Sequence, residues 1–295
     1  MELFVQLMIN GLIVGSLYGV VAMCFVLVYK STQVVNFAQG EFLLVGAWTC
    51  LSLLTYFELP FWLGFLVTLA FMTVFGILLQ ALVLRPLIGE SAISVVMVTV
   101  GLAIFFQAAL NMIFGSFAKP FPQVFSQETI EIFGLQIETA YLMSIVPSII
   151  IMVAFYIFFK RSRWGLAMRA TAYDQQVAQS LGISVKNVFA MAWAISAVVS
   201  GVAGIVLGMV NTVSNGLAFI GIKVFPATIV GGLDSIVGAV IGGLIIGVLE
   251  NMAEFVDGQF LHFGNLYAIA PFYILIIFLM VKPYGLFGTK DIERL

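Results

Sequence analysis

Long apolar runs constrain the fold of this sequence more than any other feature. A helix needs about 20 consecutive apolar residues to cross the hydrocarbon core of a bilayer. The sequence contains six runs of that kind, at residues 5–29, 62–84, 93–114, 139–159, 187–210 and 266–281. Hydrophobic residues make up 62% and charged residues 9% of the chain, whereas soluble domains contain roughly 45–50% and about 25%. We therefore predict an all-α polytopic membrane protein.

Three further apolar stretches are short or interrupted by glycine, at residues 42–57, 217–232 and 236–250. Each of them could be a complete pass, a half-helix or a re-entrant segment, because irregular backbone occurs at membrane depth where protein or water covers it. We expect about eight transmembrane helices in total, including these short or re-entrant segments. Residues 1–295 are expected to form a single transmembrane domain.

Small residues recur at every fourth position in three of the apolar runs. They are Gly11, Gly15 and Gly19, then Ser200, Gly204 and Gly208, and finally Ala239, Gly243 and Gly247. Such faces let helix backbones approach closely within a membrane. The pattern predicts a tightly packed helix bundle and gives no indication of what the protein carries.

The basic residues are distributed unevenly between the predicted loops. If the N terminus lies outside and the helices alternate from there, only Lys119 and Lys223 fall outside the cytoplasm. The other ten basic residues then face the cytoplasm: Lys30, Arg85, Lys160, Arg161, Arg163, Arg169, Lys186, Lys282, Lys290 and Arg294. Because cytoplasmic loops carry an excess of lysine and arginine, this asymmetry predicts an N-out/C-in topology.

Two polar, glycine-containing motifs, NFAQGE and GGLDS, stand at the edges of apolar segments. Their candidate residues are Asn36, Gln39 and Glu41 in the first motif and Asp234 and Ser235 in the second. A carboxylate near membrane depth costs a few kcal/mol, so it should face protein or water. In transporters, glycine-broken segments in both halves of a chain line the pathway. We therefore interpret these residues as a substrate pathway; the alternative is that both acids cap helix starts at the interface.

The sequence contains no motif for catalysis or nucleotide binding, since G-x-x-x-x-G-K-[ST] and H-E-x-x-H are both absent. His262 is the only histidine, and Cys24 and Cys50 lie in apolar runs, so neither a metal site nor a disulfide is expected. An aspartyl protease dyad is excluded because Asp174 lies in the most polar segment of the chain. We expect no catalytic residue, metal or cofactor in this chain, and its net charge of −2 does not indicate a nucleic-acid partner.

The longest polar run, RATAYDQQVAQSLGIS, lies in a predicted cytoplasmic loop at residues 169–186. Thr171 and Asp174 have the spacing of a capping box, and Gly182 stands where a helix-terminating glycine belongs. Between them, Tyr173, Val177 and Leu181 share one face of the predicted helix. This apolar face needs a partner. A membrane surface is one alternative, but surface helices usually carry basic residues on their polar face, so a groove on a soluble protein fits better.

Strings along nearly the whole chain resemble the LivH-type permeases of branched-chain amino acid ABC importers. They are NGLIVGSLYGVVAM, NFAQGE, LRPL, RATAYDQQVAQSLGIS, SGVAGIVLG, FPATIVGGLDSIVGAVIGGLIIGVLE and KPYGLFG. The long central and C-terminal strings are specific, whereas the glycine patterns alone are not. Gln39 stands where that family commonly has histidine, so a neutral amide replaces a titratable group.

The resemblance implies a non-catalytic, multi-pass permease subunit in the bacterial inner membrane. It implies four kinds of partner: a related second permease, two cytoplasmic ATPase subunits that bind ATP and Mg²⁺, a periplasmic substrate-binding protein and the lipid bilayer. Branched-chain or other hydrophobic amino acids are the expected cargo, with urea or short-chain amides as the alternative and a self-contained small-solute channel as a different class. In such an importer, residues 171–182 would be the coupling helix that docks in a cleft of an ATPase subunit.

Overall fold

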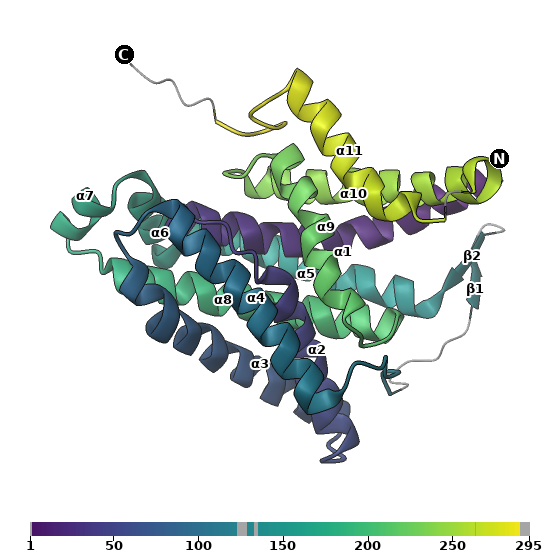
Figure 1. The fold of residues 1–295 in the computed structure, drawn as a ribbon, viewed down its shortest axis with the longest axis horizontal. Helices are drawn as coiled ribbons and strands as arrows, with labels where there is room; N and C mark the ends of the chain where they lie inside the picture. Colours follow the sequence, from purple (N-terminus) through teal and green to yellow (C-terminus); the bar gives the residue numbers. More distant parts are fainter. Residues whose placement is uncertain (1, 123–128, 133–134, 263, 290–295) are drawn as a thin grey trace. The chain divides into compact units, whose positions relative to one another are not determined.

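A computed structural model of the chain describes residues 2–122, 129–132, 135–262 and 264–289. Helices account for most of the described chain (Figure 1). The α-helices are α1 (Glu2–Thr32), α2 (Gln39–Thr55), α3 (Phe61–Leu79), α4 (Ala92–Phe114), α5 (Thr139–Arg161), α6 (Arg163–Tyr173), α7 (Gln175–Ser180), α8 (Val185–Val210), α9 (Gly216–Gly231), α10 (Ile236–Val256) and α11 (Leu266–Val281). Short π- and 3₁₀-helical turns, at Gln80–Leu84, Arg85–Leu87 and Asp257–Leu261, extend α3 and α10.

A short hairpin is the departure from the predicted all-α fold. Strands β1 (Thr129–Ile132) and β2 (Leu135–Glu138) pair antiparallel, with Thr129 opposite Glu138. The hairpin directly precedes α5. Alternating apolar and polar residues in TIEI and LQIE are compatible with strands, and the apolar runs on which the prediction rested do not cover this segment.

Within the described residues, six helical segments are long and apolar enough to cross a membrane. They are Phe4–Thr32, Phe61–Leu87, Ala92–Phe114, Tyr141–Arg161, Val185–Val210 and Ile236–Leu261. The first five coincide with predicted spans, and this part of the prediction is confirmed. The count of eight transmembrane helices and the orientation stay predictions.

The sixth span is a correction to the sequence prediction. The run at 266–281 forms α11, which has 16 residues and is therefore only about 24 Å long, shorter than the roughly 30 Å hydrocarbon core. The stretch predicted to be short, 236–250, instead continues to Leu261 and has 26 residues. Glu250 interrupts the apolar pattern, which made the run look shorter, but in the structure this side chain is buried and ion-paired, so the helix continues past it.

The chain divides into two compact units, each of which is described separately. Unit 1 contains Met1–Val26, Gln127–Met152 and Lys223–Leu295. Unit 2 contains Leu27–Ser126 and Val153–Ile222. Helices α1, α5 and α9 therefore each contribute one part to unit 1 and the other part to unit 2. That residues 1–295 form a single transmembrane domain stays a prediction.

Small residues bring the helices of each unit into close contact, as their spacing predicts. In unit 1, a side chain at Gly243 or Gly247 of α10 would collide with the backbone of α1 at Gly19 or Gly15. In unit 2, a side chain at Gly204 of α8 would collide with the backbone of α2. These approaches leave no room for a methyl group, so the glycine stripes determine which helix faces meet.

Candidate functional site

The first polar motif forms the connection between α1 and α2 in unit 2. Asn36 and Gln39 are fully buried. The Asn36 amide group donates to the Gln39 side-chain oxygen at 3.0 Å, and the backbone N–H of Ala38 donates to the Asn36 side-chain oxygen at 3.1 Å. Asparagine favours such turns because its short side chain bonds to nearby backbone groups. Asn36 thereby fixes both the turn and the first residue of α2.

Gln39 also connects α2 to α8. Its amide group donates to the Ser200 hydroxyl, and the Ser196 hydroxyl donates to the Gln39 side-chain oxygen at 3.1 Å. Both serines are fully buried and lie one turn apart on α8. We call Asn36, Gln39, Ser196 and Ser200 the Gln39 network. Sequence reasoning missed Ser196 and treated Ser200 as packing, although two serines four residues apart in an apolar helix are a signal for such a contact.

Glu41 lies in the first turn of α2, and only 7% of it is exposed. The N-cap residue of this helix is Ala38, whose side chain cannot cap it. The negative charge of Glu41 is therefore placed where the unpaired N–H groups of a helix start favour it. Burial and this position together satisfy the requirement that the carboxylate face protein rather than lipid. Its role in a substrate pathway stays a prediction.

The second polar motif forms the loop between α9 and α10 in unit 1. Ser235 caps α10, because its hydroxyl accepts a hydrogen bond from the backbone N–H of Gly238 at 3.0 Å. The Asp234 carboxylate accepts hydrogen bonds from the hydroxyl and, at 3.1 Å, the backbone N–H of Thr289. Ser235 rather than the acid Asp234 therefore caps the helix start, and Asp234 attaches the C-terminal segment to the loop.

The capping box predicted in the polar loop is wrong. Helix α6 already begins after Ser162, whose hydroxyl accepts a hydrogen bond from the backbone N–H of Gly165 at 2.8 Å. Thr171 is consequently inside α6, where its buried hydroxyl donates to the carbonyl of Ala167. Asp174 alone caps the next helix, accepting from the backbone N–H groups of Gln176 and Val177 at 2.7 and 2.9 Å.

The helix of the polar loop, α7, is thus shorter than predicted. It has six residues and is followed by Gly182 in a left-handed conformation with φ of +82°, which agrees with the expected glycine stop. The predicted apolar residues are exposed in this chain, at 94% for Tyr173, 54% for Val177 and 75% for Leu181. Ala178, between Val177 and Leu181, is buried. Tyr173 ends α6 and the extended Asp174 separates it from α7, so the prediction that the three residues share one helix face is wrong. All three nevertheless present apolar surface without a partner in the described chain.

A cavity of about 220 Å³ lies beside α7 in unit 2, and sequence reasoning did not predict it. The end of α1 and the segment before α4 form its walls together with the starts of α7 and α8. Thr32, Glu90, Gln175 and Trp193 are among the lining residues. Because Gln175 is the first residue of α7, a displacement of α7 would alter this cavity.

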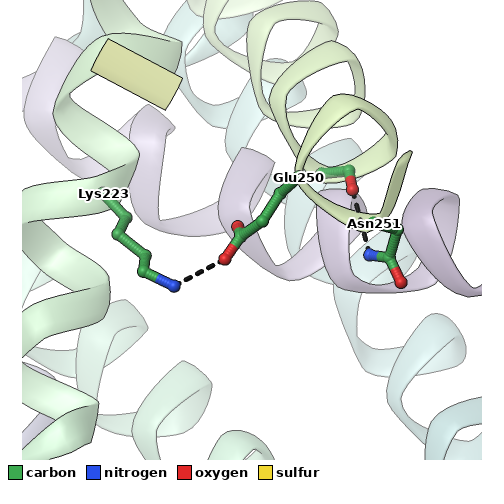
Figure 2. Close-up of polar contacts among 4 residues, drawn as sticks. Lys223, Glu250 and Asn251 are labelled. Atoms are coloured by element: carbon green, nitrogen blue, oxygen red, sulfur yellow. Dashed lines mark hydrogen bonds and ion pairs between the residues drawn. The ribbon is translucent and has the colours of Figure 1, made fainter. Parts of the chain in front are cut away.

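A buried ion pair in unit 1 was also missed by sequence reasoning. The Lys223 ammonium of α9 lies 2.5 Å from the Glu250 carboxylate of α10, and the residues are 8% and 6% exposed. Figure 2 shows the two side chains pointing toward each other, with Asn251 donating separately to the carbonyl of Gly247. The signal was present, since a lone charge inside an apolar run is costly and requires a partner. The topology prediction instead assigned Lys223 to a position outside the cytoplasm.

Comparison with known proteins places the chain in a family. Residues 7–281 match the family described as branched-chain amino acid transport system / permease component. The chain belongs to this family. It is 31% identical over 308 residues to the high-affinity branched-chain amino acid transport system permease protein BraD of Pseudomonas aeruginosa, covering 99% of this chain and 98% of BraD.

Other relatives agree over the same length. The chain is 29% identical to the permease protein LivH of Escherichia coli K12, covering 99% of this chain and 97% of LivH. It is 30% identical to the probable branched-chain amino acid transport permease protein LivH of Methanocaldococcus jannaschii, covering 97% and 94%. The solved structure of PsaBC from Streptococcus pneumoniae in complex with Fab has a similar fold, with a TM-score of 0.51 and 15% identity over 93% of this chain and 91% of that chain.

Proposed function

We propose that this chain is the membrane-embedded permease subunit of an ABC importer that moves branched-chain amino acids into the cytoplasm. The observation that carries the proposal is the family match over residues 7–281, together with relatives of about 30% identity that align along almost their whole length. Those relatives are named for branched-chain amino acids. Neither urea or amide import nor a self-contained channel is favoured by these names.

The remaining parts of the importer follow from this assignment. A related second permease, two cytoplasmic ATPase subunits with ATP and Mg²⁺, and a periplasmic binding protein complete the assembly. The inner membrane and an N-out/C-in orientation are proposed from the ten-to-two distribution of basic residues. This chain contributes the translocation path and no catalytic group.

Exposed apolar residues at the end of α6 and on α7 support a docking role for the polar loop. Tyr173, Val177 and Leu181 present apolar surface to solvent, and exposed apolar surface on a short helix fits a groove on a partner. Asp174 and Gly182 fix the start and end of α7, while Thr171 is buried in the preceding helix and bonds within it to the carbonyl of Ala167. We propose that this segment contacts an ATPase subunit. Helix α8 begins at Val185, so movement of α7 reaches an apolar span directly.

The first polar motif supports a place for Glu41 along the substrate path. Asn36 and Gln39 hold the turn that precedes Glu41, and the residues of the motif other than Phe37 are buried. Asp234 and Ser235 have structural contacts that account for their positions. We therefore propose that Glu41 faces the substrate path, and that Asp234 and Ser235 shape the α9–α10 loop.

Deletion of the gene in cells that carry it natively tests the proposed function. Uptake of labelled leucine, isoleucine and valine should fall to the background of the remaining transporters, and a plasmid copy should restore it. Labelled urea and acetamide serve as matched cargoes. Unchanged amino-acid uptake with loss of urea or acetamide uptake would overturn the assignment.

A further inference from the structure

The Lys223–Glu250 pair of unit 1 is placed where charges are expensive. Lys223 lies within the apolar helix α9, and Glu250 lies within the span Ile236–Leu261. Both residues are more than nine-tenths buried. Two charges removed from water need good geometry and additional hydrogen bonds before their mutual attraction offsets the loss of hydration. The way these remaining hydrogen-bonding groups are satisfied therefore indicates what the pair does.

The carboxylate of Glu250 is only half satisfied. Its Oε1 atom receives the Lys223 ammonium at 2.5 Å. Its Oε2 atom is buried and has no hydrogen-bond partner among the described residues. The hydroxyl of the buried Tyr18 interacts with Glu250 electrostatically and through a side-chain hydrogen bond, and Oε2 still has no partner at full hydrogen-bonding geometry among the described residues. A buried carboxylate oxygen without a donor is rare in a purely structural pair.

The ammonium of Lys223 also retains hydrogen-bonding capacity. An ammonium has three N–H donors, and the hydrogen bond found for Lys223 among the described residues goes to Glu250. The ammonium lies 4.6 Å from the centre of the Tyr267 ring, a cation–π contact that leaves further donors available. The site thus offers an open anionic acceptor and open cationic donors next to each other.

We infer that Lys223 and Glu250 recognise the α-carboxylate and the α-ammonium of a transported amino acid, with Glu250 Oε2 accepting from the ammonium and Lys223 donating to the carboxylate. This inference rests on the proposed function and identifies the residues that contact the cargo. A zwitterion that leaves water must have both of its charges compensated. A neutral site of one cation and one anion provides this compensation and adds no net charge. Urea and simple amides carry neither charge and do not require such a pair.

A structural lock between α9 and α10 is the competing explanation, and the stability of single variants does not separate the two. Removing one partner leaves the other charge buried and unpaired under either explanation. The double variant Lys223→Met/Glu250→Gln does separate them, because replacing a whole buried pair with neutral groups of similar volume is often neutral for folding. If the pair is a structural lock, the neutral groups take over its role and transport continues. If the pair is a recognition site, transport is lost.

The experiment uses the native importer in cells that carry the double variant on the chromosome. The amount of the chain and its co-purification with the ATPase subunits should match the wild type, while leucine uptake falls about tenfold or more, as for loss of a buried charge contact. Asn251→Leu, beside Glu250 on the same helix, is the matched control and should transport normally. Leucine uptake by the double variant at the wild-type rate would overturn the inference.

Two further outcomes complete the test. If the double variant does not accumulate, leucine uptake by the near-isosteric Glu250→Gln tests the inference instead. Its uptake should fall while the amount of the chain stays normal. Wild-type uptake by Glu250→Gln, or failure of both variants to accumulate, would assign the pair to folding and overturn the inference. Failure of the proposed function is distinguishable, because deletion of the whole gene would then leave amino-acid uptake unchanged.

Discussion

Each unit contains one buried polar centre among apolar helices, and the two centres are built in opposite ways. In unit 2, the Gln39 network consists of neutral groups, and its central carboxamide both donates and accepts hydrogen bonds. In unit 1, the Lys223–Glu250 pair consists of full charges, and one carboxylate oxygen has no partner among the described residues. A satisfied neutral network rigidifies helix packing, whereas an incompletely satisfied ion pair retains capacity for a ligand. The comparison thus separates a helix tie from a recognition site.

The largest expected effect is on the charged side of this comparison. Glu250→Ala leaves the Lys223 ammonium buried without its counter-charge, which should lower the free energy of unfolding by about 3–5 kcal/mol. Thermal unfolding of the purified chain in detergent measures the loss. Glu254→Ala, one turn later on α10 and exposed, is the matched control and should change stability by less than about 0.5 kcal/mol. Equal stability of the two variants would contradict the burial of the pair.

A second prediction concerns an apolar face on the protein surface rather than polar groups in its interior. Val177→Asp places a charge in the exposed apolar face of α7 and should weaken an interface there by about 1–3 kcal/mol. Recovery of ATPase subunits in a pull-down should fall, together with stimulated ATP hydrolysis. Gln176→Ala, on an exposed position of the same helix, should do less. Undiminished recovery with wild-type hydrolysis would remove the docking role from α7.

The neutral side of the comparison predicts a smaller effect. Gln39→Leu preserves side-chain volume but removes the partner of Asn36, Ser196 and Ser200. Buried groups left unsatisfied cost about 1–3 kcal/mol, so the free energy of unfolding should fall by less than in Glu250→Ala. Thermal unfolding in the same detergent measures both. A larger loss for Gln39→Leu than for Glu250→Ala would reverse the comparison.

Much of this fold follows from residue patterns, whereas both polar centres depend on three-dimensional register. The length of the apolar runs predicts five of the six long spans. Small residues at every fourth position predict which faces of α1 and α10 meet. The pairing of Lys223 with Glu250 depends on how α9 packs on α10, which no local pattern encodes. The cap at Asp174 was misassigned because Ser162, twelve positions upstream, begins a helix that includes Thr171.

Glu41 tests whether the neutral unit also contributes to transport. Glu41→Gln removes the charge from the first turn of α2 while preserving size, so stability should fall by at most about 1 kcal/mol, the value of a favourable helix-end charge. Leucine uptake in cells should fall severalfold if the carboxylate faces the substrate path. A variant with normal abundance and wild-type uptake would leave Glu41 with a helix-stabilising role only.

The smallest expected effect is that of Gln39→His, which restores the residue common in the resembling family. A neutral imidazole has one donor and one acceptor, enough to replace the bonds of Gln39 to Ser200 and Ser196. Stability near pH 8 should therefore change by less than about 1 kcal/mol. Protonation converts the acceptor into a donor, so the contact from Ser196 is lost as the pH falls through the usual imidazole range near about 6.5.

The pH dependence of this variant consequently reports on the hydrogen-bond roles within the network. In the wild type, the amide of Gln39 does not titrate, so the network should be insensitive to pH between 5 and 8. In Gln39→His, the free energy of unfolding and leucine uptake should both decrease toward pH 5, because the charged ring has no acceptor for the Ser196 hydroxyl. Gln39→Leu provides the control, since its deficit should not vary with pH. A flat profile for the histidine variant would show that the network does not require an acceptor at position 39.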